Sequence, residues 1–168
     1  MPSPRSVPRK LKSLSALLAI VRHARATGQT IVFANGCFDL LHAGHVILLE
    51  RAKQLGDLLI VGMNSDRSVR RLKGPSRPIV AQRDRARILA ALESVDYVTI
   101  FDEQTPRRLI YRLRPHLLVK GADWASGEVV GHEVVQQAGG RVVRIPLLKG
   151  YSTSRLIQQI HAQTGVRE

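Results

Sequence analysis

The chain of 168 residues carries 26 lysine and arginine side chains against 13 aspartate and glutamate side chains, a net charge of +13, and 44% of its residues are hydrophobic. This length fits one domain with a substantial buried core. No apolar run approaches the roughly 20 residues that a membrane span needs, and the proline-rich segment 1–12 is a poor secretion signal. The single cysteine, Cys37, excludes an internal disulfide and suits a reducing compartment, so we expect a cytoplasmic protein.

Basic side chains are concentrated in residues 1–30, which contain no acidic residue, and in residues 67–87, where Asp84 is the only acidic one. They form either a solvated surface or a field that attracts polyanionic substrates. A nucleic-acid-binding module is a third interpretation. Against it, aromatic residues make up only 4% of the chain, and no helix-turn-helix, zinc-ligand or RNA-recognition pattern is present.

The apolar spacing of Leu11, Leu14, Leu17, Leu18 and Val21 predicts an amphipathic helix over 11–26 that ends near Gly28. Strands and helices then alternate. The strands are apolar throughout, which is typical of a parallel sheet covered on both faces. The predicted fold is therefore a doubly wound, Rossmann-like α/β domain with a five-stranded parallel sheet and an extra N-terminal helix. We expect strands at 30–35, 58–63, 96–101, 116–120 and 141–146, and helices at 44–55, 66–72, 83–93, 106–113, 131–138 and 153–163. The domain would span 29–163, with a basic tail and helix at 1–28 and a short tail at 164–168.

The stretch from Asn35 to His45 joins the first predicted strand to the next helix. A glycine-bearing turn at this place presents backbone N–H groups at the positive end of a helix dipole, which suits phosphate. His42 and His45 lie three residues apart, so both rings share one face of the first helical turn. They could instead form half of a metal site with Cys37 and Asp39, or be structural histidines. The order of strand, glycine turn, histidines and helix favours phosphate binding.

Further candidate residues follow other predicted strands, and ligands of doubly wound sheets bind beyond the carboxyl ends of the strands. Lys73 and Lys120 are candidate cations, although each could be an ordinary solvated lysine. Asp39 is as well suited to capping a backbone N–H as to touching a ligand. The hydroxyls that begin the last helix could be a simple N-cap, phosphate ligands or both. We expect one crevice to collect His42, Lys73, the segment 120–123 and the segment 152–154.

Residues 36–45, with the histidine pair in the form His42-Ala43-Gly44-His45, resemble the signature of the cytidylyltransferase-like nucleotidyltransferases. The segment 151–157 resembles the serine- and threonine-rich helix start of the same family. Residues 71–74, 84–92 and 118–124 resemble the branch that adenylylates D-glycero-β-D-manno-heptose 1-phosphate. The resemblance runs from about residue 30 to residue 160.

The resemblance implies a site for catalysis and a site for the nucleotide. His42, His45 and Lys73 would be catalytic. No protein-bound metal is implied, and Mg²⁺ would arrive with ATP, held by phosphate oxygens and water. Trp124 is either a contact to the nucleotide or sugar or a buried residue with no ligand. The nucleotide-binding residues implied are Gly36, Cys37, Phe38, Asp39, Gly44, Lys120, Gly121, Asp123, Tyr151, Ser152, Thr153 and Ser154.

The implied reaction converts ATP and heptose 1-phosphate into ADP-heptose, a precursor of the lipopolysaccharide core, and pyrophosphate. The chain has no room for a sugar kinase, so a separate kinase would supply the heptose phosphate. Relatives suggest a homo-oligomer, most simply a dimer, and neither a membrane nor nucleic acid is an expected partner. Glycerol-3-phosphate cytidylyltransferase, or another nucleotidyltransferase of small phosphates, is the alternative within the family. A basic nucleic-acid-binding module is the alternative of another class.

Overall fold

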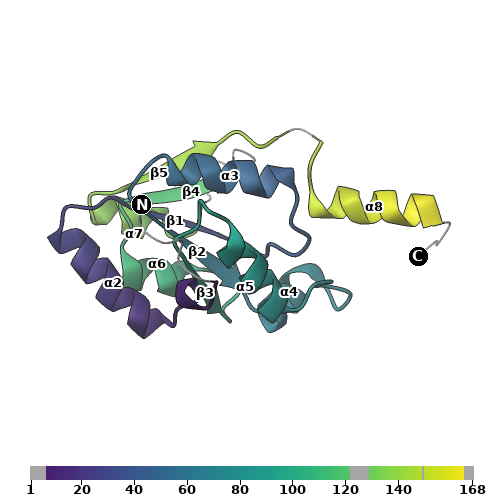
Figure 1. Cartoon of the computed structure of the whole chain (residues 1–168), viewed down its shortest axis with the longest axis horizontal. Coiled ribbons are helices and arrows are strands. Elements are labelled where there is room, and N and C mark those ends of the chain that lie inside the picture. The colour runs from purple at the N-terminus through teal and green to yellow at the C-terminus, as the bar shows by residue number, and fades with distance from the viewer. Residues whose placement is uncertain (1–6, 122–128, 149, 165–168) are drawn as a thin grey trace.

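A computed structural model of the chain describes residues 7–121, 129–148 and 150–164. It contains a five-stranded sheet in the order β3-β2-β1-β4-β5, and every neighbouring pair of strands is parallel. Helices cover both faces of this sheet (Figure 1), which confirms the predicted doubly wound fold. The strands are β1 (Ile31–Gly36), β2 (Leu58–Asn64), β3 (Tyr97–Phe101), β4 (Leu117–Gly121) and β5 (Arg141–Ile145). The helices are α1 (Val7–Lys10), α2 (Leu14–Ala26), α3 (Ala43–Lys53), α4 (Asp66–Lys73), α5 (Gln82–Ala91), α6 (Arg107–Leu113), α7 (His132–Gln137) and α8 (Thr153–Thr164).

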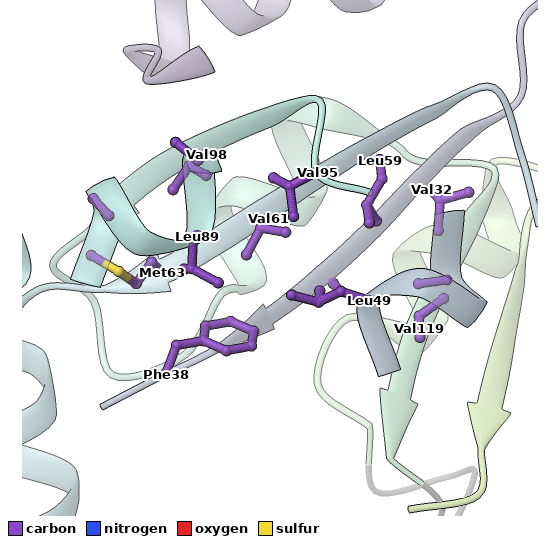
Figure 2. Close-up of a cluster of buried hydrophobic side chains, with 14 of the residues drawn as sticks. Val32, Phe38, Leu49, Leu59, Val61, Met63, Leu89, Val95, Val98 and Val119 are labelled. Atoms are coloured by element: carbon purple, nitrogen blue, oxygen red, sulfur yellow. The ribbon is translucent and has the colours of Figure 1, made fainter. Parts of the chain in front are cut away.

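The central strand β1 is buried along most of its length because it supplies side chains to two separate cores. Ile31 and Phe33 pack with apolar residues of α2, α6 and α7. Val32 and Ala34 face the other way and pack with residues of α3 and α5. Figure 2 shows this second core, which also receives Phe38 from the turn after β1. An uninterrupted apolar strand therefore reflects a sheet with helices on both faces.

Helix α2 packs against one face of the sheet, but it begins later than the apolar spacing predicts. Ser13 is its N-cap, and the Ser13 hydroxyl accepts a hydrogen bond from the Ala16 N–H. The expectation of helix over 11–13 is therefore wrong. Leu11 forms a bridge with Val98 of the edge strand β3, and the Lys12 N–H donates to the Val98 carbonyl. The preceding segment thus protects part of an exposed sheet edge.

The side of the sheet on which successive strands are added changes at β1. Strands β2 and β3 are added on one side of β1, whereas β4 and β5 are added on the other side. The carboxyl ends of β1 and β4 therefore lie next to each other, and ligands of doubly wound folds bind at such a switch point.

Among the described helices, none is long and apolar enough to cross a membrane.

Candidate functional site

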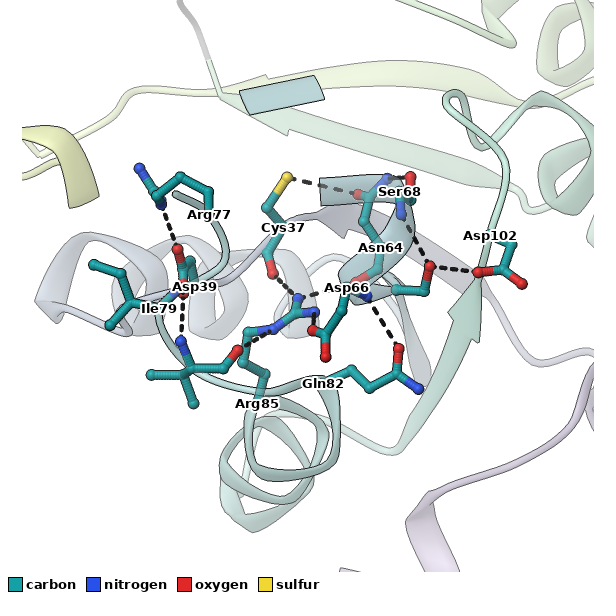
Figure 3. A network of polar contacts seen from close by, with 12 residues as sticks. Cys37, Asp39, Asn64, Asp66, Ser68, Arg77, Ile79, Gln82, Arg85 and Asp102 are labelled. Carbon is teal, nitrogen blue, oxygen red and sulfur yellow. Dashed lines mark hydrogen bonds and ion pairs between the residues drawn. The ribbon is translucent and has the colours of Figure 1, made fainter. Parts of the chain in front are cut away.

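The turn after β1 is held in shape by a buried arginine (Figure 3). The Arg85 side chain is fully buried, and one terminal nitrogen donates to the carbonyls of both Cys37 and Asn64, which lie at the ends of β1 and β2. Its Nε donates to the Val80 carbonyl over 2.9 Å, and its other terminal nitrogen pairs with the Asp66 carboxylate at 2.7 Å. Arg85 thereby ties together the ends of two strands and the segment that leads into α5.

Asp39 ties the same turn to the segment that follows α4. Its carboxylate is 2% exposed and accepts hydrogen bonds from Arg77 Nε at 2.5 Å, from the Ile79 N–H at 2.8 Å and from the Val80 N–H at 2.9 Å. Burial alone would raise the pKa of Asp39. The hydrogen bonds from Val80, Arg77 and Ile79 together outweigh burial and hold that pKa below its usual value. Of the two interpretations of Asp39, the structure displays the capping one.

The two histidines lie at the beginning of α3. His42 is the N-cap residue, His45 is in the first turn, and their rings stack with centroids 3.9 Å apart. Gly44 permits this close approach, because a Cβ there would lie 3.0 Å from His42 Nδ1 and 3.2 Å from the Tyr151 side chain. Phe38, whose backbone is left-handed with a φ of 47°, places its buried ring 5.3 Å from that of His45.

Both imidazoles are neutral at physiological pH. Burial, and secondarily the neighbouring His42, lowers the pKa of His45 from 6.5 to about 4. Burial also lowers the pKa of His42. The Nδ1 atoms of both rings are buried, and neither has a hydrogen-bond partner among the described residues. Before a phosphate binds, the pair is therefore neutral and consists of hydrogen-bonding groups.

The beginnings of α3 and α8 converge on one cavity of about 360 Å³. At α8, the Ser152 hydroxyl accepts a hydrogen bond from the Arg155 N–H, and the Thr153 hydroxyl donates to the Leu40 carbonyl. The rest of α8 extends away from the sheet (Figure 1). Two helix N-termini directed at one cavity give it a positive potential that favours phosphate groups. We call this the first cavity; its lining includes Cys37, Phe38, Asp39, His42, Gly44, His45, Lys73, Arg77, Tyr151, Ser152, Thr153 and Ser154.

A second cavity of about 380 Å³ lies at the carboxyl ends of the strands around the switch point. Its polar lining is mostly neutral, and Lys73 and Cys37 line both cavities. Burial raises the pKa of the Cys37 thiol, which keeps it protonated. Two adjoining cavities that share a lysine suit a reaction between two anionic molecules. The second cavity is lined by Asn35, Gly36, Cys37, Asn64, Leu72, Lys73, Gln104, Thr105, Pro106, Lys120, Val129 and Val130.

No three histidine, cysteine, aspartate or glutamate side chains gather into a metal site within the part of the chain that the structure describes. The Asp39 carboxylate, the acidic group nearest to the histidines in sequence, is occupied by Arg77 and two backbone N–H groups.

Most of the predicted site residues meet at these two cavities. Eleven of them, from Cys37 to Ser154, line the first cavity, while Gly36 and Lys120 line the second. Gly121 ends β4 and lines neither cavity, and Asp123 and Trp124 lie outside the described residues. Sequence reasoning did not single out Arg77, which lines the first cavity. In the sequence, Arg77 is distinguished only by its position between Gly74 and Pro78 in a segment rich in arginine.

The fold and the site together define a doubly wound α/β protein in which the starts of two helices line one cavity. Residues 33–159 match the model of the cytidylyltransferase-like family. The chain belongs to this family.

Relatives extend the comparison over most of the chain. It is 55% identical over 151 residues to the bifunctional protein HldE of Geotalea uraniireducens and 52% identical over 151 residues to that of Geobacter sulfurreducens. Each alignment covers 90% of this chain and 31% of the relative, so the chain spans about a third of the length of these proteins. The crystal structure of the lipopolysaccharide core biosynthesis protein from Thermoplasma volcanium is 29% identical, with a TM-score of 0.62, and covers 73% of this chain.

Proposed function

We propose that the chain transfers the adenylyl group of ATP to D-glycero-β-D-manno-heptose 1-phosphate, producing ADP-heptose and pyrophosphate. The observation that carries this proposal is the convergence of the histidine pair and the α8 helix start on one cavity, which shares Lys73 with a second cavity. The resemblance of segments 84–92 and 118–124 to heptose adenylyltransferases supports the choice of sugar. A structural relative that acts in lipopolysaccharide core biosynthesis supports it as well.

The acceptor needs no general base. A sugar 1-phosphate has a second pKa of about 6, so it presents a charged oxygen nucleophile at neutral pH. That oxygen attacks the α-phosphorus of ATP, the bond between the α-phosphorus and the bridging oxygen breaks, and pyrophosphate leaves. Catalysis then consists mainly of positioning and charge stabilisation. His42 and His45 donate hydrogen bonds to phosphate oxygens, while Lys73, between the cavities, faces the reacting phosphates.

The second cavity is the proposed acceptor site. Asn64, Gln104 and Thr105 bring amide and hydroxyl groups to its lining, and such groups pair with sugar hydroxyls. Asn35, which also lines it, has a buried side-chain oxygen with no hydrogen-bond partner among the described residues. A sugar hydroxyl that donates to this oxygen would satisfy it.

Further proposals concern the setting of the reaction. Mg²⁺ would bind with ATP and neutralise part of the phosphate charge. We place the protein in the cytoplasm, where ATP is available and Cys37 stays reduced.

We also propose a homo-oligomer, most simply a two-fold dimer, since closed dimers are the commonest soluble assemblies. Sedimentation of a monomer at micromolar concentration would contradict the last proposal.

A panel of sugar phosphates with ATP and with CTP, followed by pyrophosphate release, tests the function. We expect the fastest release with ATP and heptose 1-phosphate in the presence of Mg²⁺. Faster turnover of CTP with glycerol 3-phosphate would overturn the choice of substrates while leaving the class of reaction intact. Binding of polynucleotide without any pyrophosphate release would overturn the enzyme assignment.

A further inference from the structure

Arg77 is anchored at one edge of its guanidinium only. Its Nε donates to the buried Asp39 carboxylate at 2.5 Å, and its side chain is 15% exposed. Figure 3 shows the remainder of the guanidinium extending away from Asp39. No hydrogen bond to a described residue engages its two terminal nitrogens. These nitrogens carry four N–H donors, and the residue lines the first cavity.

The backbone around Arg77 is fixed by the same carboxylate. Asp39 also accepts hydrogen bonds from the N–H groups of Ile79 and Val80, and Arg85 binds the Val80 carbonyl. The anchoring groups Asp39 and Arg85 are both buried. Arg77 is therefore held in one orientation before any ligand binds, which reduces the entropy that binding would cost.

The first cavity contains few sources of full positive charge. Among its described lining residues, Lys73 and Arg77 are the only lysine or arginine side chains, and the two histidines are neutral. A polyphosphate carries several negative charges, and helix N-termini contribute only partial positive charges. The guanidinium plane also matches the geometry of phosphate oxygens better than an ammonium does.

We propose that Arg77 binds the β- and γ-phosphates of ATP, which leave as pyrophosphate, and that Asp39 is the positioning residue that directs it. The inference deepens the proposed function, since it names the side chain that receives the charge of the leaving group. Arg77 lines the first cavity, with the α3 and α8 helix starts, and does not line the second. Its ligand is therefore the polyphosphate of the nucleotide and not the phosphate of the acceptor.

Titration of the full chain with inorganic pyrophosphate tests the assignment. Arg77→Ala should weaken pyrophosphate binding at least tenfold, the scale of a lost hydrogen bond between charged groups. Arg77→Lys should recover little of this loss, because an ammonium cannot pair with Asp39 and reach the phosphate together. The matched control is Arg83→Ala, which removes the same charge from an exposed position outside both cavities and should stay within twofold of the native chain.

The Asp39→Asn variant distinguishes two roles of Asp39 by whether pyrophosphate binds more tightly or more weakly. In one role Asp39 positions Arg77, and in the other it only repels anions through its charge. Removing a negative charge from the cavity should by itself tighten the binding of an anion. If Asp39 directs Arg77, the substitution instead weakens pyrophosphate binding, and it raises the KM for ATP more than the KM for the acceptor. Tighter binding by a folded Asp39→Asn variant would overturn the positioning role.

Chemical modification of arginine side chains in the native chain tests the same contact without requiring that any variant folds. Pyrophosphate should slow the reaction of phenylglyoxal with Arg77 and leave the reaction of Arg83 unchanged, as read from peptide masses. Equal rates with and without pyrophosphate would overturn the assignment, as would native affinity in a folded Arg77→Ala variant or a native chain that binds no pyrophosphate. Pyrophosphate binding through Arg77 without adenylyl transfer would instead refute the proposed function alone.

Discussion

The rings of His42 and His45 stack with an interplanar angle of 19° and centroids 3.9 Å apart. Two protonated imidazoles in this arrangement would repel each other, and burial also disfavours their charged forms. The histidine pair at the start of α3 is therefore neutral, and under the proposed function it acts as two oriented hydrogen-bond donors. In the proposed reaction, stabilisation by full charges then depends on Lys73 and Arg77, which line the same cavity.

The first prediction concerns the titration of His45. Its pKa of about 4 in the folded chain lies below the 6.5 of an exposed histidine. Between these values the unfolded chain binds a proton that the folded chain does not, so stability is lost as the pH falls from about 6.5 to about 4. This loss reaches roughly 3 kcal/mol. Histidine NMR should show His45 titrating near pH 4, and urea unfolding of His45→Gln should depend less steeply on pH in this window. A midpoint near 6.5 would contradict the neutral pair.

The second prediction is that His42→Ala and His45→Ala each lower kcat about a hundredfold, the scale of losing one preorganised donor. Both side chains line an open cavity, so the far-ultraviolet circular dichroism of the variants should match that of the native chain. Near-normal kcat in either variant would remove that histidine from the mechanism. About one zinc ion per chain by metal analysis would revive the metal interpretation.

The third prediction separates Lys73 from Ser154. Lys73 lines both cavities, so we expect Lys73→Ala to lower kcat more than it weakens ATP binding. Ser154 lies in the first turn of α8 and lines only the first cavity, so Ser154→Ala should chiefly raise the KM for ATP. Steady-state kinetics of the two variants checks this division. Normal kcat with a raised KM in Lys73→Ala would make Lys73 a ground-state anchor.

The fourth prediction concerns the stability of the turn after β1. Arg85→Met should lower the free energy of unfolding by about 3–5 kcal/mol, because it leaves Asp66 unpaired and removes the donor to three carbonyls that are buried or partly buried. Arg87→Met on the same helix changes an exposed residue and should shift stability by less than about 0.5 kcal/mol. Equal effects in denaturant titrations would show that the buried contacts of Arg85 do not stabilise the fold.

The fold could be predicted from sequence because each signal was local. The apolar run around Val32 is flanked by polar and glycine residues, so its length and surroundings marked a buried strand. The start of α2 was misplaced because Leu11 continues the helical spacing, although it pairs with β3 through a contact distant in sequence. There the Ser13 cap was the stronger signal.

The site could be predicted only in part, for a related reason. The histidines and the α8 hydroxyls stand in short motifs, whereas the contacts of Asp39 with Arg77 and of Arg85 with Cys37 join segments about 40 to 50 residues apart. Composition suggested that the arginines of 67–87 formed a surface or an attracting field. Arg85 instead lies in the interior, because the strand ends that surround it present carbonyls that need donors.

The most direct test of the central claim follows the phosphorus atoms of ATP. The chain is incubated with Mg²⁺, heptose 1-phosphate and ATP labelled either in the α-phosphate or in the γ-phosphate. The α label should appear in ADP-heptose and the γ label in pyrophosphate, with no γ label on the sugar. Transfer of the γ label to the sugar, or release of both labels without a nucleotide sugar, would contradict adenylyl transfer at the two cavities.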